Sequence, residues 1–321
     1  MKFSRNKNTG FAYMFFTILI LYFLLCMILQ PAKFISQSLN GISAWAFNVL
    51  PSVLPFMFFT KALSALDFMP KLTRPFSKIS QKVFKTPPIS MYAFAMAILS
   101  GYPVGSKMVA DLYMQRKISK EDAFKMSSFC STSGPMFIIG AVGIGMFNSS
   151  KIGYILFLSH VIGAVLNGIL YRNFKLKEKD SANNLQNGGN NTSKTQFNLS
   201  EIVLNSTLSI LSVGCIITIF FIVIECFSPV FSLLPDNIAY FFEGLIEITK
   251  GCIDLSTLSN KFLAVALCSF TISFGGISTI LQSITMLSNL QMPIKFFTLQ
   301  KFTHACLSLI VTMILLIFVS I

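Results

Sequence analysis

The chain has 321 residues and a net charge of +13, with 54% hydrophobic residues and only 12% charged residues. Soluble domains carry about 25% charged residues, so this composition excludes a soluble globule, whose surface could not be covered. Several uncharged runs also exceed the ~18 residues that mark a membrane-spanning helix. The sequence therefore predicts an all-α polytopic membrane protein in contact with the lipid bilayer.

The positive charge does not indicate nucleic acid as a partner. The basic residues lie in loops between apolar runs and form no basic face with interleaved aromatic side chains. The pattern instead follows the tendency of basic loops to remain in the cytoplasm. We find no HExxH, GxSxG or GxxxxGK[ST] motif, so we expect neither an enzyme nor a chain that hydrolyses ATP. The seven cysteines contain no CxxC pair, and His160 and His304 are far apart in sequence, so no metal or other cofactor is expected.

Basic residues precede an apolar stretch at residues 11–29, which is longer than the ~7–15 residues of a signal-peptide core and lacks a cleavage site. We interpret residues 1–33 as a retained first span with a cytoplasmic amino terminus. Hydropathy predicts about seven full spans, with direct crossings after the first at residues 34–60, 127–150, 152–171, 202–224, 262–294 and 302–321.

Residues 89–117 form an exception to this pattern. The eleven residues from Ile89 to Leu99 reach only about halfway through a ~30 Å hydrocarbon core at ~1.5 Å per residue. They are followed by Ser100-Gly101-Tyr102-Pro103-Val104-Gly105, where two glycines and a proline interrupt the helix. Charged residues come next, beginning with Lys107. This order predicts a re-entrant helical hairpin, because irregular backbone is tolerated at membrane depth only where it lines a protein cavity.

A second hairpin is predicted at residues 237–261, where Glu243, Glu247, Lys250 and Asp254 lie among apolar residues. The alternative is an amphipathic helix lying on the membrane surface. With both segments as hairpins, 21 of the 25 Lys and Arg residues lie on the cytoplasmic side, including Lys301. The outer side receives Lys33, Lys151, Lys250 and Lys261.

This topology divides the chain into two halves of opposite orientation, residues 34–171 and 201–321, each with one hairpin. Ser128-Phe129 and Gly134 in the first half match Ser269-Phe270 and Gly275 in the second at a common spacing of 141 residues, and Pro135 and Gly276 follow the shared glycine. Inverted repeats with broken helices are typical of alternating-access transporters, which hold substrate near the midplane. The polar, Asn-rich residues 172–200 between the halves are predicted to be a disordered cytoplasmic linker.

Three polar features in apolar surroundings are candidates for a binding site. They are the segment from Ser100 to Lys107, the cluster Ser131-Thr132-Ser133-Gly134-Pro135, and Gly275-Gly276 after Ser273. Hydroxyl groups and the carbonyls freed by proline can bind a ligand, although small residues also serve helix packing. An ammonium at Lys107 inside the membrane indicates function unless its side chain extends to the interface.

At these residues the chain resembles the YlbJ-type sporulation integral membrane proteins, which carry the nucleoside-recognition or gate domain. The resemblance rests on Leu99-Ser-Gly-Tyr-Pro-Val-Gly-Ser-Lys107 and on Ser128-Phe-Cys-Ser-Thr-Ser-Gly-Pro-Met-Phe-Ile-Ile-Gly-Ala-Val-Gly143. It continues less specifically through Glu247-Ile-Thr-Lys-Gly251 and Ser273-Phe-Gly-Gly-Ile-Ser278. The resemblance implies distant kinship to concentrative nucleoside transporters, which use paired re-entrant hairpins.

The resemblance also implies a transporter that moves dipicolinic acid from the mother cell across the outer forespore membrane. Lys107 and Lys250 would bind the two carboxylates, Tyr102 would offer a ring face, and Glu243 and Glu247 would pair with lysine or bind a coupling cation. A nucleoside permease and a non-transporting scaffold of a sporulation complex are the alternatives, and a homo-oligomer is compatible with each. The expected substrate site comprises Ser100, Gly101, Tyr102, Pro103, Gly105, Lys107, Ser131, Thr132, Ser133, Gly134, Glu247, Lys250, Ser273, Gly275 and Gly276.

Overall fold

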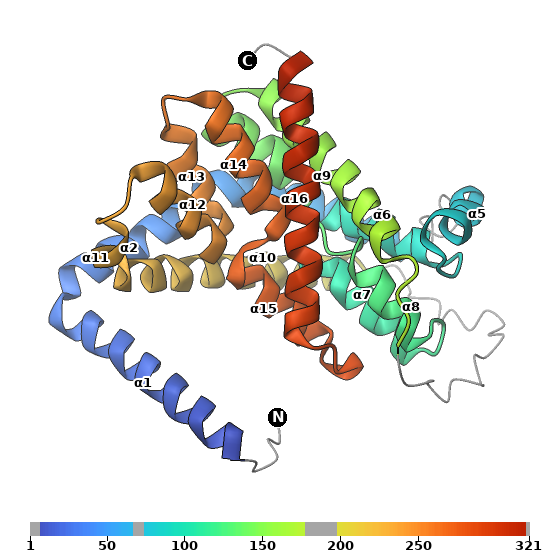
Figure 1. The fold of residues 1–321 in the computed structure, drawn as a ribbon, viewed down its shortest axis with the longest axis horizontal. Helices are drawn as coiled ribbons and strands as arrows, with labels where there is room; N and C mark the ends of the chain where they lie inside the picture. Colours follow the sequence, from blue (N-terminus) through green and yellow to red (C-terminus); the bar gives the residue numbers. More distant parts are fainter. Residues whose placement is uncertain (1–6, 67–73, 177–197, 319–321) are drawn as a thin grey trace.

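The computed structural model describes residues 7–66, 74–176 and 198–318, and within these ranges all regular structure is helical (Figure 1). The predicted all-α class is confirmed. Five described segments are long and apolar enough to cross a membrane: Pro31–Leu63, Ser150–Tyr171, Leu199–Cys226, Lys261–Met286 and Ile294–Phe318. The other predicted crossings coincide with shorter apolar helices, so the expected count of about seven spans stays a prediction.

The chain begins with α1 (Lys7–Leu29), which projects from the rest of the molecule (Figure 1). After one residue α2 (Pro31–Ser43) starts with proline, which is tolerated in the first turn of a helix because its missing N–H has no partner there anyway. The π-helical η1 (Ala44–Val49) and α3 (Leu50–Ala65) continue this line. At the bend between α1 and α2, Lys33 forms a 2.5 Å ion pair with Glu225.

The first predicted hairpin is a pair of short helices, α6 (Ser90–Ser100) and α7 (Val104–Met114), that pack against each other. It follows three short helical turns, η2 (Arg74–Phe76), α5 (Ser77–Ile79) and η3 (Ser80–Phe84). Gly101 ends α6 with a φ of 74°, a conformation that glycine adopts without steric cost, and the Tyr102–Pro103 peptide is cis. Helix α6 therefore ends in the segment where the two glycines and the proline predicted a break.

The structure corrects the expected direct crossing at residues 127–150. Helix α8 (Lys120–Ser127) ends at Ser127, residues 128–135 are largely non-helical, and the π-helical η4 (Met136–Met146) follows. Pro135 cannot donate an N–H to a preceding turn, and glycine at 134 favours an irregular backbone, so a continuous helix is not formed. Polar residues that hydropathy placed inside a span thus lie in an unwound segment.

The second half contains an equivalent break. After α9 (Ser150–Tyr171), α10 (Leu199–Cys226) and α11 (Ser228–Phe231), the second predicted hairpin appears as α12 (Asp236–Ile246) and α13 (Ile248–Thr257). Helix α14 (Lys261–Phe274) then stops at Gly275, whose φ is 91°, and α15 (Gly276–Met286) continues. The chain ends with η5 (Ser288–Leu290) and α16 (Ile294–Phe318).

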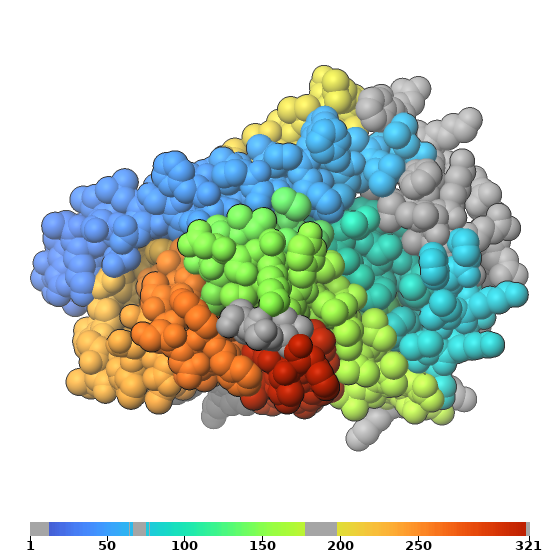
Figure 2. Space-filling model, turned by 90° about the horizontal axis from the view of Figure 1, so that it is seen from above, coloured from blue at the N-terminus to red at the C-terminus, as the bar shows by residue number. Residues whose placement is uncertain are grey.

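Helices α9, α14 and α16 pack side by side, whereas α10 packs along α2 and α3 (Figure 1). Small residues allow this close contact, since a Cβ added to Gly163 on α9 would lie 2.1 Å from Ser308 Oγ on α16. Figure 2 shows that the start of α9, the α13–α14 connection and the end of α16 lie on one face. The predicted topology puts these three places on the same side of the membrane. The predicted linker lies mostly outside the described residues.

Candidate functional site

The tips of the two hairpins contact the two helix breaks in corresponding pairs. A Cβ added to Gly101 would lie 2.7 Å from the backbone nitrogen of Gly134, so the first tip lies directly on the unwound segment 128–135. A Cβ added to Gly276 would lie 3.1 Å from the carbonyl oxygen of Ile246, so the second tip lies on the second break. Two discontinuous helices with two hairpin tips between them are the arrangement in which transporters place a substrate near the midplane.

His160 on α9 joins the two breaks. The Ser133 N–H donates to His160 Nε2 at 2.9 Å, which requires that this nitrogen be unprotonated. The proton of the neutral ring then lies on Nδ1, 2.8 Å from Ser273 Oγ, which accepts it. His160 is 1% exposed. A single buried ring thus fixes a backbone group of the first break and a side chain of the second.

Lys301 on α16 is a second connection between these elements, and its position in the structure differs from the predicted one. We expected this lysine among the cytoplasmic loop residues, but its side chain is 2% exposed in the interior of the bundle. Its ammonium donates to the Tyr102 hydroxyl at 2.6 Å and to the Ser131 carbonyl at 2.8 Å. The expectation failed because α16 already begins at Ile294, so residue 301 is two turns inside a helix.

An inner cavity of about 90 Å³ lies where the tips and breaks meet. Six residues of the predicted site line it: Ser100, Gly101, Tyr102, Ser133, Gly134 and Glu247. Four polar residues of the lining are outside the predicted site: Thr249, Ser278, Thr279 and Gln282. Ser278 and Gln282 lie one turn apart in a helix that is otherwise mostly apolar, and this spacing was an available signal. The rest of the wall is apolar and includes Phe56, Met57 and Phe137.

A larger outer cavity of about 820 Å³ adjoins the inner one, and we call it the vestibule. The two share Tyr102 and Gln282 in their walls, together with three apolar residues. Lys61 and Lys107 line the vestibule, and Glu201 is its acidic residue. Lys107 is exposed there, whereas the Lys61 ammonium donates to the Asn205 carbonyl at 2.6 Å and to Ser209 Oγ at 2.8 Å. The vestibule therefore has an excess of positive charge.

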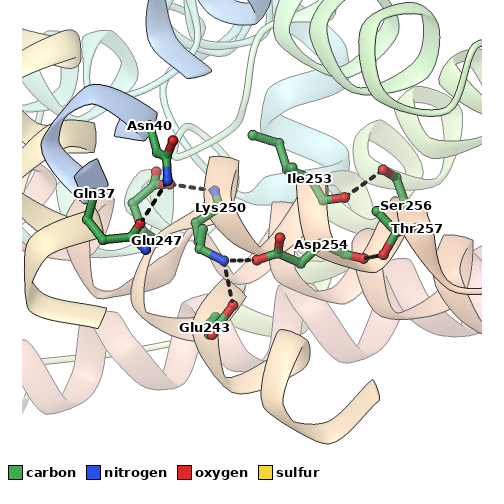
Figure 3. A network of polar contacts seen from close by, with 9 residues as sticks. All are labelled: Gln37, Asn40, Glu243, Glu247, Lys250, Ile253, Asp254, Ser256 and Thr257. Carbon is green, nitrogen blue, oxygen red and sulfur yellow. Dashed lines mark hydrogen bonds and ion pairs between the residues drawn. The ribbon is translucent and has the colours of Figure 1, made fainter. Parts of the chain in front are cut away.

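The second hairpin neutralises its own lysine (Figure 3). The Lys250 ammonium lies 3.1 Å from Glu243 and also forms an ion pair with Asp254. Lys250 lines neither cavity, so the structure favours charge neutralisation over binding of a substrate carboxylate. Glu247 is not one of the two ion-pair partners of the Lys250 ammonium. Its Oε2 instead accepts the backbone N–H of Lys250 at 2.8 Å and thereby caps α13.

The remaining predicted residues have different surroundings. Pro103 lines the vestibule. Gly105 packs so closely on the unwound segment that an added Cβ would lie 1.7 Å from the Cys130 carbonyl oxygen. The hydroxyls of Ser131 and Thr132 are buried without a hydrogen-bond partner among the described residues. The following residues line neither cavity in this structure: Gly105, Ser131, Thr132, Lys250, Ser273, Gly275 and Gly276.

These features define a helical integral membrane protein with a polar interior site between broken helices. The chain is 32% identical over 170 residues to the sporulation integral membrane protein YlbJ of Bacillus subtilis (strain 168). The match covers 51% of this chain and 41% of the relative, so the chain spans about two fifths of the relative's length. This similarity confirms the resemblance to the YlbJ-type sporulation integral membrane proteins.

No family model matches the chain. No solved structure matches it either, so the expected kinship to concentrative nucleoside transporters stays a prediction.

Proposed function

We propose that the protein transports dipicolinic acid across the outer forespore membrane, from the mother cell toward the spore. The observation that carries this proposal is the pair of adjoining cavities, in which a basic vestibule leads to a polar space between two hairpin tips and two helix breaks. The similarity to a sporulation membrane protein supports the biological setting. A scaffold would need no such interior space.

The size and chemistry of the vestibule suit a small planar dianion. Its 820 Å³ lies in the range of ~300–1,000 Å³ typical of small-molecule sites, whereas the inner cavity is well below that range. The vestibule lysines attract carboxylates, and Tyr102 presents a ring at the entrance to the inner cavity. Dipicolinate therefore binds first in the vestibule, with one carboxylate directed at Tyr102.

The structure changes one part of the expected binding site. Lys107 keeps its proposed role, because it is exposed in the vestibule and forms no ion pair within the described ranges. Lys61 replaces Lys250 in this role. Lys250 is ion-paired with two carboxylates, whereas Lys61 lines the same vestibule as Lys107. The vestibule thus offers two lysines, one from α3 and one from α7, to a substrate carboxylate.

A nucleoside permease is the second candidate, and one observation favours it. The inner cavity contains the carboxylate of Glu247 and the amide of Gln282 but no lysine among its lining residues. Such groups accept and donate hydrogen bonds to the hydroxyls and base of a neutral nucleoside. The vestibule lysines have no partner in that ligand.

Counterflow uptake into proteoliposomes distinguishes the candidates. Proteoliposomes that contain the purified protein are loaded with unlabelled dipicolinate or unlabelled uridine. Entry of the labelled form of each compound from the outside is then measured. We expect accelerated entry of dipicolinate only, and loss of most of this entry in Lys107→Met but not in the matched surface variant Lys295→Met. Acceleration by uridine alone would establish the permease. Entry of neither compound above empty liposomes would contradict transport of both and leave the scaffold.

A further inference from the structure

Lys301 is a buried lysine whose side chain has no acidic partner among the described residues. None of the four ion pairs formed by the described residues includes it, although its side chain is 2% exposed. Its two hydrogen bonds go to a hydroxyl and a backbone carbonyl, which are neutral acceptors. Removing an ammonium from water without a paired anion is costly, so this position gains from an incoming negative group.

Tyr102 is the residue that Lys301 holds in place. The tyrosine belongs to the tip of the first hairpin and lines the inner cavity as well as the vestibule. Its ring lies 4.6 Å from the Lys301 ammonium, and its hydroxyl lies 3.4 Å from the Ile272 carbonyl on α14. A single side chain at the boundary of two cavities is thus attached to the second half of the molecule.

The lysine also lies against the second helix break. A Cβ added to Gly275 would be 3.4 Å from Lys301 Cε and 3.5 Å from the Tyr102 ring. The Ser131 carbonyl that Lys301 binds belongs to the first break. Moving the Lys301 ammonium away from Tyr102 therefore removes the shorter of the two hydrogen bonds that attach the Tyr102 hydroxyl to the second half of the molecule.

We propose that Lys301 and Tyr102 form a latch between the vestibule and the inner cavity, and that a substrate carboxylate opens it by replacing the Tyr102 hydroxyl at the Lys301 ammonium. The inference rests on the proposed function insofar as the substrate is an anion. The carboxylate supplies the counter-charge that Lys301 lacks, while the tyrosine ring turns aside and opens the inner cavity. A neutral ligand offers no such exchange, so the latch selects carboxylates.

The latch itself is tested without any substrate. Ser278 lines only the inner cavity, and its hydroxyl is buried and unpartnered among the described residues, so Ser278→Cys is a nearly isosteric reporter. A cationic, membrane-impermeant thiosulfonate is added, and mass spectrometry measures labelling of residue 278 separately from the native cysteines. Adding Tyr102→Phe or Lys301→Met should raise the labelling rate about tenfold, because a charge-assisted hydrogen bond closes the entrance.

Matched substitutions at exposed positions are the controls, with Tyr154→Phe on α9 and Lys295→Met on α16. Both should leave labelling unchanged. Equal labelling in Tyr102→Phe and in the reporter alone would overturn the latch. The Phe variant keeps the ring and removes one hydroxyl, so this comparison holds even where Lys301→Met protein fails to accumulate.

The role of the carboxylate is tested by thermal stabilisation of the purified protein with dipicolinate, benzoate and uridine. Dipicolinate should raise the melting temperature of the wild type and of Lys301→Arg, and should raise it less in Lys301→Met and Lys301→Gln, in which only the vestibule lysines remain to bind it. An unchanged shift in both neutral variants would show that the carboxylate does not bind Lys301. Absence of any dipicolinate shift in the wild type contradicts the proposed function and the carboxylate trigger, whereas the labelling result still decides the latch.

Discussion

The two hairpins have the same helix-break-helix form, but the lysine of the first is exposed and the lysine of the second is ion-paired. The first, α6 and α7, carries an exposed lysine at position 107 that faces the vestibule, and its tip residue Tyr102 is uncharged. The second, α12 and α13, encloses Lys250 between Glu243 and Asp254 and places the carboxylate of Glu247 at the tip. The same backbone form thus carries Lys107, which is available to a ligand, in one half and Lys250, which is neutralised by two carboxylates, in the other.

This difference assigns different tasks to the two halves. In the proposed function the available lysine attracts an anion at the entrance, whereas the ion-paired lysine belongs to the hairpin that carries the Glu247 carboxylate. Substitution of the lysine should therefore act on transport in the first hairpin and on stability in the second. The following predictions test this division.

The largest effect is expected from filling the space at Gly105. A Cβ there would lie 1.7 Å from the Cys130 carbonyl oxygen and 2.6 Å from Ala97 Cβ, so Gly105→Val forces the first hairpin off the unwound segment. Overpacking of this kind costs about 3 kcal/mol or more, enough to prevent accumulation in the membrane. Immunoblotting of membrane fractions measures the effect. Gly145→Ala is the control, since its nearest neighbour is 3.4 Å away, and normal accumulation of both variants would refute the packing argument.

The next effect distinguishes the two lysines. Lys250→Met leaves Glu243 and Asp254 facing each other without a cation, and should lower the free energy of unfolding by about 3 kcal/mol. Lys107→Met removes an exposed, unpaired ammonium and should change stability by less than about 0.5 kcal/mol while abolishing most dipicolinate uptake. Thermal unfolding of the purified variants and uptake into proteoliposomes give the two readouts. Equal stability loss in both variants would contradict the division of tasks.

Hydropathy and turn chemistry predicted much of this fold. The eleven-residue half-helix before Gly101 is too short to cross a bilayer, and this length predicted the first hairpin together with the glycines, the proline and the charged residues that follow. Segment 128–135 was less predictable, because its neighbours are apolar enough for a span and only Gly134 and Pro135 indicate the break. Hydropathy averages over a window and does not register where one proline stops a helix.

Site residues could be predicted where glycine or proline makes the backbone irregular. Residues that reach the site only through contacts between distant parts of the sequence could not be predicted. Glycines and hydroxyl residues of the tips and breaks were identifiable in the sequence, and five of them line the inner cavity: Ser100, Gly101, Tyr102, Ser133 and Gly134. Lys301 resembled a loop lysine, since neither the Ser131 carbonyl nor the Tyr102 hydroxyl is near it in sequence. Its two hydrogen-bond partners are separated from it by 170 and 199 positions in the sequence, so no local sequence pattern indicates its burial.

A smaller effect is expected from the cap of the second hairpin. Glu247 caps α13 through the Lys250 N–H, whereas Pro103 gives α7 no side-chain cap. Glu247→Ala should cost about 1 kcal/mol of stability and also alter uptake, because the carboxylate lines the inner cavity. Asn260→Ala removes the exposed cap of α14 and is the matched control, with a similar loss of stability and unchanged uptake. Unaltered uptake in Glu247→Ala would show that the carboxylate serves only the helix.

The smallest effect is expected from the connection between the halves. The two halves contact each other directly, through α9 with α14 and α16 and through α10 with α2 and α3, so their association does not depend on the intervening chain. Replacing residues 177–197 by a Gly/Ser sequence of equal length should leave accumulation and uptake within about twofold of the wild type, because such sequences act as flexible linkers. Membrane immunoblots and dipicolinate uptake measure this. Normal accumulation with abolished uptake would mean that the segment binds a partner or the substrate, and transport would then depend on more than the contrast between the two hairpins.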